Sequence, residues 1–243
     1  MAGVNRVDGT KESLSLEELA AGMSGDTSAP YYIAEVLREA IYRGMLEEGQ
    51  PLHQAQLAQR LGVSPIPLRE ALRLLETEGL VHFQGYRGAV VTPLSLEEAG
   101  ELYEMVTALE THLLRIAFPR ITRRVVEDAE RTLLSMENER DCLKWRDLNQ
   151  MFHNLFYEPA DRPLTLDVLA RLRRKTDRYI RIHLASMRDE SQRQHKEILN
   201  AVEARNCEAA IEALTAHLAY TSNDLQSCMR LEHTADRRRI RGG

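Results

Sequence analysis

The sequence predicts a mainly α-helical protein with two domains. An N-terminal module of short helices and one β-hairpin precedes a C-terminal all-α helical bundle. Aromatic residues make up only 5% of the 243 residues, whereas helix-favouring leucine, alanine, glutamate and arginine are abundant. Apolar residues recur at helical spacing from Tyr31 onwards. Two short apolar runs, LVHFQ and GAVVTP, are typical of strands and follow one another closely, the second ending at Pro93.

Residues 1–29 contain little apolar periodicity apart from the run LSLEELAAGM. We expect them to be a flexible N-terminal tail that includes one marginal helix. From Tyr31 an apolar stripe marks the first firm helix, which ends near Gly44. The segment MLEEGQPL contains Gly49 and Pro51, so the chain is expected to turn there.

The most informative run is LAQRLGVSPIPLREALRLLETEGLV, residues 57–81. Gly62 ends a short helix, and Ser64 can cap the next one. Pro65 suits the first helical position because its missing N–H has no partner there. The second helix continues to Gly79 with apolar residues at helical spacing: Leu68, Leu72 and Leu75. Two short helices around a glycine turn are typical of a helix-turn-helix, whose second helix fits the major groove of DNA.

The runs LVHFQ and GAVVTP are joined by GYRG and predict a β-hairpin, the wing of a winged helix. Pro93 closes this module, so we expect a winged helix-turn-helix DNA-binding domain over residues 30–94. Residues 31–94 hold six arginines and no lysine against seven glutamates, a net charge of −1. Duplex binding relies on phosphate neutralisation, so the arginines must gather on one face, and tight nonspecific binding is not expected.

The C-terminal region begins with a capping box formed by Ser95 and Glu98. No later run is typical of a strand, and we expect residues 95–232 to form an all-α domain. Its predicted helices cover residues 95–117, 122–141, 144–157, 163–187, 189–204 and 207–230. Residues 233–243 contain RRRIRGG and are predicted to be a basic, solvated C-terminal tail.

Composition limits the class of protein. The net charge is −5 and the hydrophobic content is 43%, which is ordinary for a soluble globular chain. No stretch approaches the roughly 20 apolar residues of a membrane span, and the N-terminus lacks the apolar core of a signal peptide. Cys142, Cys207 and Cys228 show no CxxC pairing. This argues against a disulfide framework or thiolate zinc site, so we expect a cytoplasmic protein with no membrane partner.

The motifs GMLEEGQPL, LAQRLGVS, PLREALRLLETEGLV and RGAVV resemble, in order and spacing, the winged helix of GntR-family bacterial transcription regulators. The stretches DLNQMFHNLFY and QHKEILNAVEARNCEAAIEALTAHL are similar to the C-terminal (FCD) domain of the FadR-type subfamily. The resemblance implies a homodimer that binds a near-palindromic operator. It also implies that residues 95–232 bind an effector and dimerise, and that the protein is not an enzyme.

The resemblance places the DNA contacts in the second helix of the helix-turn-helix and at the wing tip. Arginine grips guanine edges with two hydrogen bonds, although Arg73 can equally lie on the outer face and pair with a glutamate. The family usually has arginine and threonine after the VS motif, where this chain has Pro65 and Ile66. One arginine contact is therefore missing, and Ile66 can meet a thymine methyl group. The predicted DNA-binding set is Ser64, Ile66, Arg69, Arg73, Arg87 and Gly88.

Three histidines lie on the apolar faces of three different predicted helices: His153, His195 and His217. Neutral imidazole nitrogens suit zinc or nickel, with positions left open for water or a ligand. A single histidine on an apolar face is more often a core residue with satisfied hydrogen bonds. The spacings of these three, however, resemble the metal-binding FadR-type bundle, which implies that they bind a divalent metal ion.

The family usually supplies a fourth metal ligand, an aspartate one helical turn before the first histidine, where this chain has Asn149. Its amide oxygen can bind a metal but adds no negative charge, so weaker binding is expected. An arginine that grips an anionic effector is common in the first helix of the bundle, where this chain has Val106 and Thr107. Two arginines on a later helix could bind a small organic acid or a less acidic metabolite instead, although a surface position is their commoner role: Arg174 and Arg178.

Three functions are compatible with these patterns. The first is a ligand-responsive regulator. The two recognition helices of its dimer must lie about 34 Å apart, one turn of DNA, to read both half-sites, and the effector changes that separation. The second is a metal-sensing or metal-stabilised regulator without an organic ligand. The third is a three-histidine metalloenzyme. It is disfavoured because no carboxylate has the spacing of an obvious general base, since Glu197 lies on a different face from His195.

Overall fold

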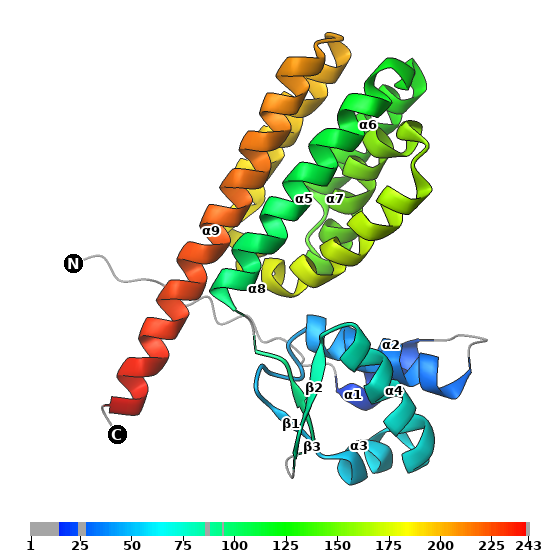
Figure 1. Ribbon diagram of the computed structural model, residues 1–243, viewed down its shortest axis with the longest axis vertical. Coiled ribbons are helices and arrows are strands. Elements are labelled where there is room, and N and C mark those ends of the chain that lie inside the picture. The colour runs from blue at the N-terminus through cyan, green and yellow to red at the C-terminus, as the bar shows by residue number, and fades with distance from the viewer. Residues whose placement is uncertain (1–14, 24–27, 86–87, 94, 242–243) are drawn as a thin grey trace. The chain divides into compact units, whose positions relative to one another are not determined.

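The computed structural model describes residues 15–23, 28–85, 88–93 and 95–241, without the side chains of 142–143, 177–186 and 232–241 (Figure 1). The chain divides into two compact units after Pro93. The N-terminal unit combines short helices with a small sheet, and the described residues of the C-terminal unit form helices joined by short connections. The predicted fold class, a winged helix-turn-helix followed by an all-α bundle, is confirmed.

The N-terminal unit is built around a helix-turn-helix, α3 (Gln54–Leu61) and α4 (Pro65–Thr77), with α2 (Ala29–Tyr42) packed against it. The strands β1 (Pro51–Leu52), β2 (Val81–Gln84) and β3 (Gly88–Val91) form an antiparallel sheet in the order β1-β3-β2. Leu52 faces Ala89, and Val81 faces Val91. This register turns apolar side chains of the wing towards the core that the three helices share.

The turn of the helix-turn-helix depends on one backbone conformation. Gly62 has φ 64° and caps α3 in the left-handed region, where a residue without Cβ has no steric penalty. Ser64 is the N-cap residue of α4, as its sequence position predicts, but its hydroxyl makes no capping hydrogen bond there. Leu68, Leu72 and Leu75 are fully buried and fix α4 by its inner face, which leaves the opposite face to solvent.

A short helix, α1 (Leu16–Gly22), lies within the segment expected to be a flexible tail over residues 1–29. The Ser15 hydroxyl accepts from the Glu18 N–H, and the Glu18 carboxylate accepts from the Ser15 N–H, which completes a capping box. Leu16 and Leu19 are buried in the core of the N-terminal unit. The described part of this segment is therefore packed, because its two leucines are one turn apart and reach the same core.

The C-terminal unit consists of α5 (Leu96–Ala117), α6 (Arg123–Asn138), α7 (Cys142–Tyr157), α8 (Pro163–Glu203) and α9 (Cys207–Arg241), with short 3₁₀ turns after α5 and α7. The helices predicted over 163–187 and 189–204 are one continuous helix, α8. Arg188, the residue between them, and its neighbours Met187 and Asp189 include no glycine or proline that would end a helix. Helix α9 continues to Arg241 through most of the basic segment that was expected to be a tail. Among the described residues, no helix is both long and apolar enough to cross a membrane.

Candidate metal centre and nucleic-acid interface

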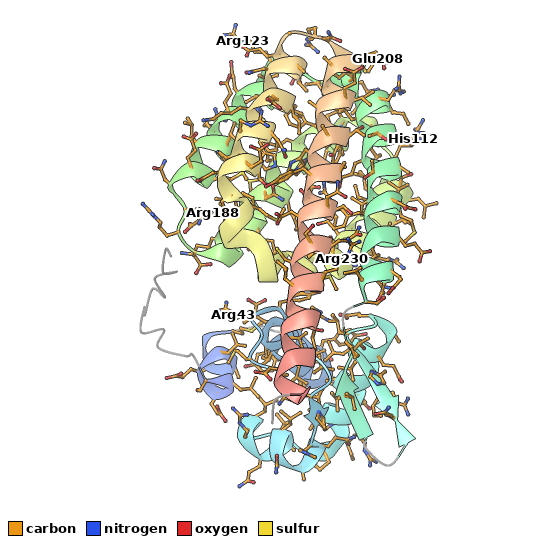
Figure 2. The ribbon with its side chains drawn as sticks, turned by 90° about the vertical axis from the view of Figure 1, so that its left-hand side faces the viewer. Arg43, His112, Arg123, Arg188, Glu208 and Arg230 are labelled. Carbon is orange, nitrogen blue, oxygen red and sulfur yellow. The ribbon has the colours of Figure 1, made fainter. Side chains whose placement is uncertain are left out.

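The structure brings together the three histidines that the sequence singled out. His153 comes from α7, His195 from α8 and His217 from α9, and all three side chains are buried. One ring nitrogen from each lies within 4.8 Å of the other two. The Nε2 atoms of His153 and His195 are 3.2 Å apart. By contrast, His112 lies on the outer surface of α5 (Figure 2).

Burial keeps the three imidazoles neutral. Loss of hydration holds the pKa values of His153 and His195 well below the ordinary 6.5, and it lowers the pKa of His217 to about 4. A neutral imidazole has one nitrogen with an available lone pair. At neutral pH the cluster therefore presents lone pairs rather than positive charges, as a cation site requires.

The donor atoms fit a divalent ion of the zinc or nickel type. Two nitrogens bound at about 2.0–2.1 Å to one tetrahedral ion lie about 3.3 Å from each other, close to the separation of 3.2 Å between His153 and His195. Asn149 Oδ1 is buried without a hydrogen-bond partner among the described residues, and Asn149 lines a cavity of about 50 Å³ together with His153 and His217. The exposed Asp147 instead pairs with Arg146. The residues present therefore fit a bound metal, with Asn149 placed to contribute an oxygen.

A hydrogen-bonded chain leads from His153 to two buried charges. The Tyr157 hydroxyl lies 3.4 Å from His153 Nδ1 and donates to Glu110 Oε2 at 2.7 Å. Glu110 is only 1% exposed, and its other oxygen accepts from Arg173 at 2.7 Å. Arg173 also donates to Asn154 Oδ1 at 2.9 Å. Glu110 is thus a buried charge that is neutralised by a cation, as buried carboxylates require.

A second chain leads from His217. Its Nδ1 lies 2.9 Å from Gln194 Oε1, and Gln194 Nε2 donates to Glu190 Oε1 at 2.9 Å. Glu190 pairs with Arg193, which lowers the pKa of the Glu190 carboxyl. In each of these two hydrogen-bonded chains, one polar side chain lies between the imidazole and a carboxylate. That side chain is Tyr157 for His153 and Gln194 for His217.

Two cavities meet at Arg173. The inner one, of about 50 Å³, touches the histidines, and an outer one of about 270 Å³ has an apolar floor that includes Leu166 and Leu169. Gln150 and Arg173 line both. Arg174, predicted to bind effector, lines the outer cavity, whereas the side chain of Arg178 lies outside the described residues. A larger groove of about 500 Å³ beside Trp145 contains none of the three histidines, so the candidate metal centre belongs to the inner cavity.

Helix α8 must bend to build this site. Arg173 and His195 are 22 residues apart in sequence, which is about 33 Å along a straight helix. The chain of contacts described above nevertheless connects them through three side chains: Glu110, Tyr157 and His153. Figure 1 shows the ribbon of α8 changing direction partway along its length.

The candidate nucleic-acid interface is the exposed start of α4. Ser64 and Ile66 are exposed, with Ile66 at 72%, and Arg69 is exposed on the next turn. Arg69 Nε donates to Gln54 Oε1 of α3 at 3.0 Å. An apolar side chain with this exposure has no role in the core of its own unit, because α4 packs through its other face.

The remaining predicted DNA contacts lie around the wing. Arg73 bonds Glu76 at 2.8 Å, and its guanidinium carbon lies 4.5 Å from the ring centre of Phe83 in β2. Gly88 opens β3 with φ 72°, a conformation that favours glycine. Arg87 lies outside the described residues.

Sequence reasoning missed four site residues: Glu110, Tyr157, Arg173 and Gln194. Glu110 could have been found because it interrupts the apolar stripe of α5 that includes Val106 and Leu113. A carboxylate that is buried at such a position needs a partner. Arg173 precedes the predicted Arg174 by one residue, which is about 100° around a helix. Nothing in the sequence of α8 alone distinguishes the two arginines.

Comparison with known proteins agrees with this architecture. The family model of bacterial regulatory proteins of the gntR family matches residues 32–91, and the FCD domain model matches residues 101–220. The uncharacterized HTH-type transcriptional regulator BphR of Paraburkholderia xenovorans is 31% identical over 195 residues, which cover 75% of this chain and 79% of BphR. The HTH-type transcriptional repressor RspR of Escherichia coli is 27% identical over 199 residues, or 80% of this chain and 87% of RspR.

A solved structure of a GntR-family transcriptional regulator from Pseudomonas syringae pv. tomato is 28% identical, with a TM-score of 0.53 over 91% of this chain and 96% of that one. Both family models therefore match in the order that the two structural units have. The chain belongs to the GntR family of bacterial transcription regulators, which are not enzymes, and its C-terminal part is an FCD domain of the kind found in the FadR subfamily.

Proposed function

We propose that the protein is a ligand-responsive transcription regulator of the cytoplasm that binds a near-palindromic operator as a homodimer. The observation that carries the proposal is the pairing of two features in one chain. The first unit presents an exposed recognition-helix start, and the second contains a buried three-histidine cluster beside a cavity. An effector-controlled regulator needs both a DNA-binding surface and a site where an effector can bind.

On the DNA side, Arg69 reads base edges and Ser64 donates to a phosphate from the start of α4. The exposed methyl groups of Ile66 suit contact with a thymine methyl group. Arg87 and Gly88 are proposed to approach the duplex from the wing. Arg73 is 68% exposed and can reach a phosphate, although its contacts with Glu76 and Phe83 give it a structural role as well.

On the effector side, His153, His195, His217 and Asn149 hold a divalent metal ion, with zinc or nickel favoured by the nitrogen-rich donor set. When bound, the ion supplies a Lewis acid that can hold a carboxylate. The side chains around the proposed metal site then limit the size of the effector that can bind beside the ion. The inner cavity of about 50 Å³ holds only a few water-sized groups.

An effector larger than a few atoms must therefore extend into the outer cavity, past Gln150 and Arg173. That cavity offers an apolar floor at Leu166 and Leu169 and cationic walls at Arg173 and Arg174. A small organic acid with a coordinating head and a short apolar body matches this lining. Arg178, on the same helix, stays a candidate contact.

The small inner cavity also favours a second candidate, a regulator that senses or is stabilised by the metal alone. A metal ion with one or two waters would fill about 50 Å³ without any organic ligand. The metalloenzyme hypothesis is abandoned, because the chain belongs to a family of transcription regulators.

Binding to a labelled DNA fragment from upstream of the gene tests the proposal. The protein is stripped of metal, reloaded with zinc or nickel, and titrated with acetate, butyrate and benzoate. A ligand-responsive regulator binds the fragment, and at least one acid changes the affinity only in the metal-loaded sample. A response to metal alone supports the second candidate. Failure to bind any upstream fragment overturns both.

A further inference from the structure

The two hydrogen-bonded chains that end at His153 and His217 have the same order of groups. In the first, Glu110 accepts from Tyr157, and the Tyr157 oxygen faces His153 Nδ1. In the second, Glu190 accepts from the Gln194 amide nitrogen, and the Gln194 oxygen faces His217 Nδ1. The chains come from different helices, so the common order does not follow from one local motif.

The proton of Tyr157 has one favourable place. Its hydroxyl lies 2.7 Å from a Glu110 oxygen that is fully buried, which is a charge-assisted hydrogen-bond distance. Because that single proton points to Glu110, the Tyr157 oxygen can only accept from His153. His153 must then carry its hydrogen on Nδ1, which leaves the Nε2 lone pair for a metal.

The same logic applies to His217. The Gln194 amide donates through nitrogen to Glu190, so its oxygen points at His217 Nδ1 at 2.9 Å. A carbonyl oxygen only accepts, so His217 also carries its hydrogen on Nδ1 and exposes Nε2. In the 3.2 Å contact between the Nε2 atoms of His153 and His195, the hydrogen must therefore come from His195.

Each carboxylate is held in place by an arginine. Arg173 bonds Glu110, and Arg193 bonds Glu190. These ion pairs prevent either carboxylate from turning away from the side chain whose hydrogen it accepts. The orientation of each imidazole is therefore set through two successive partners rather than by packing alone.

We propose that these two chains fix His153 and His217 as Nδ1–H tautomers, and that Tyr157 and Gln194 are positioning residues that aim the two Nε2 lone pairs at one cation. Partners of this kind orient metal-binding histidines and raise their basicity. The inference rests on the proposed metal centre for its purpose. The tautomers themselves are a property of the metal-free protein and can be observed without any metal.

The first experiment is long-range ¹H–¹⁵N NMR of the imidazole rings in the full-length, metal-stripped protein. The expected result is a protonated Nδ1 for His153 and His217 and a protonated Nε2 for His195. In Tyr157→Phe the Nε2–H population of His153 rises while His217 is unchanged, and Gln194→Met does the reverse. Wild-type protein with His153 and His217 protonated on Nε2 would overturn the inference.

The second experiment measures metal binding by the same variants. Co²⁺ absorption reports ligand geometry, and competition with a chelator gives the Zn²⁺ affinity. Each variant is expected to lose about 10- to 100-fold in affinity and to shift the Co²⁺ bands. The matched controls are Tyr42→Phe, a buried tyrosine of the N-terminal unit, and Gln226→Met, a half-buried glutamine of α9. Both should bind as the wild type does.

The outcomes separate the inference from the proposed metal centre. Wild-type protein that binds no Co²⁺ or Zn²⁺ refutes the metal centre, and the positioning role fails with it, whatever the tautomers are. Wild-type protein that binds metal, with variants that bind equally well, refutes the positioning role alone. Melting curves without metal identify a variant that has lost its fold. If Tyr157→Phe or Gln194→Met has lost its fold, Tyr157→His or Gln194→Asn is measured instead, and the same loss of affinity is expected.

Discussion

The Nε2 atoms of His153 and His195 lie 3.2 Å apart inside the helical unit, although the residues are 42 positions apart in sequence. Two ring nitrogens at this distance need something between them, because two lone pairs without a shared hydrogen or cation repel. Both rings are neutral and buried. A cation bound at this contact would take the place of the shared hydrogen between the two buried rings.

Replacement of His195 is expected to abolish metal binding. His195→Ala removes one of three nitrogen donors, and zinc should no longer raise the melting temperature, because a ligand stabilises the fold only at concentrations near or above its Kd. The measurements are metal content after dialysis and melting with and without Zn²⁺. His112→Ala, on the outer surface of α5 (Figure 2), should respond to zinc like the wild type. An undiminished zinc response in His195→Ala contradicts the site.

Asn149→Asp is expected to strengthen metal binding by about tenfold or more, equivalent to about 1.4 kcal/mol. The aspartate keeps an oxygen where Asn149 Oδ1 now lacks a partner among the described residues, and it adds a negative charge beside the cation. Chelator competition gives the affinity. The control is Asn138→Asp at an exposed position of α6, which adds the same charge elsewhere. Equal gains from both substitutions would mean that Asn149 is not a ligand.

Arg173→Met is expected to destabilise the protein by about 3–5 kcal/mol at neutral pH, because it leaves Glu110 as an unpaired buried charge. The two side chains of this pair are 11% and 1% exposed. Adding Glu110→Gln should recover most of the loss, since the charge is then gone. Urea unfolding of the single and double variants measures this coupling. Additive losses would show that the ion pair does not hold the two helices together.

Arg69→Ala is expected to weaken operator binding by about 1–3 kcal/mol and to relax the preference for one base pair. Arg123→Ala, at a 93% exposed position of the C-terminal unit, is the control for loss of one positive charge. It should leave the affinity within experimental error. Quantitative gel-shift or anisotropy titrations at fixed salt give both values. An Arg69 variant that binds like the control removes this residue from the interface.

Leu16→Ala is expected to destabilise the N-terminal unit by about 2–5 kcal/mol, because it removes a buried side chain from the shared core. Leu16 is 2% exposed. The control is Leu164→Ala, since that leucine is 76% exposed and should tolerate the change. Hydrogen exchange of α2 and α4 measures the effect within the unit. Unchanged exchange would mean that α1 adds no stability to the helix-turn-helix.

Local patterns in the sequence were enough for the fold class and placed the three histidines on apolar faces, whereas their interpretation as a metal site came from the resemblance to the FadR-type bundle. Gly62, Ser64 and the leucines of α4 define the helix-turn-helix through neighbours in sequence. Each histidine lies on an apolar stripe whose period is helical. The rules involved are local, and therefore they can be applied without knowing how the helices pack.

The parts that were missed depend on contacts between distant helices. Arg173 looks like an ordinary surface charge when α8 is considered alone. Glu110 interrupts the apolar stripe of α5, but that stripe does not indicate which cation pairs with it. Arg174 was predicted in place of Arg173 because the bend of α8 decides which arginine faces the site. No glycine or proline in the sequence marks that bend. Helix α1 was underestimated because two leucines in a seven-residue helix carry a weak periodicity.

The bend in α8 has a mechanical consequence. One arm of this helix carries Arg173 and the other carries Gln194 and His195, so continuous backbone joins the cationic wall of the outer cavity to the imidazoles. A molecule that displaces the Arg173 side chain breaks its bond to Glu110, and one that pushes on the helix itself changes the curvature of α8. A change in the bend would move His195 relative to His153 and His217. The curvature of α8 would then depend on what occupies the outer cavity.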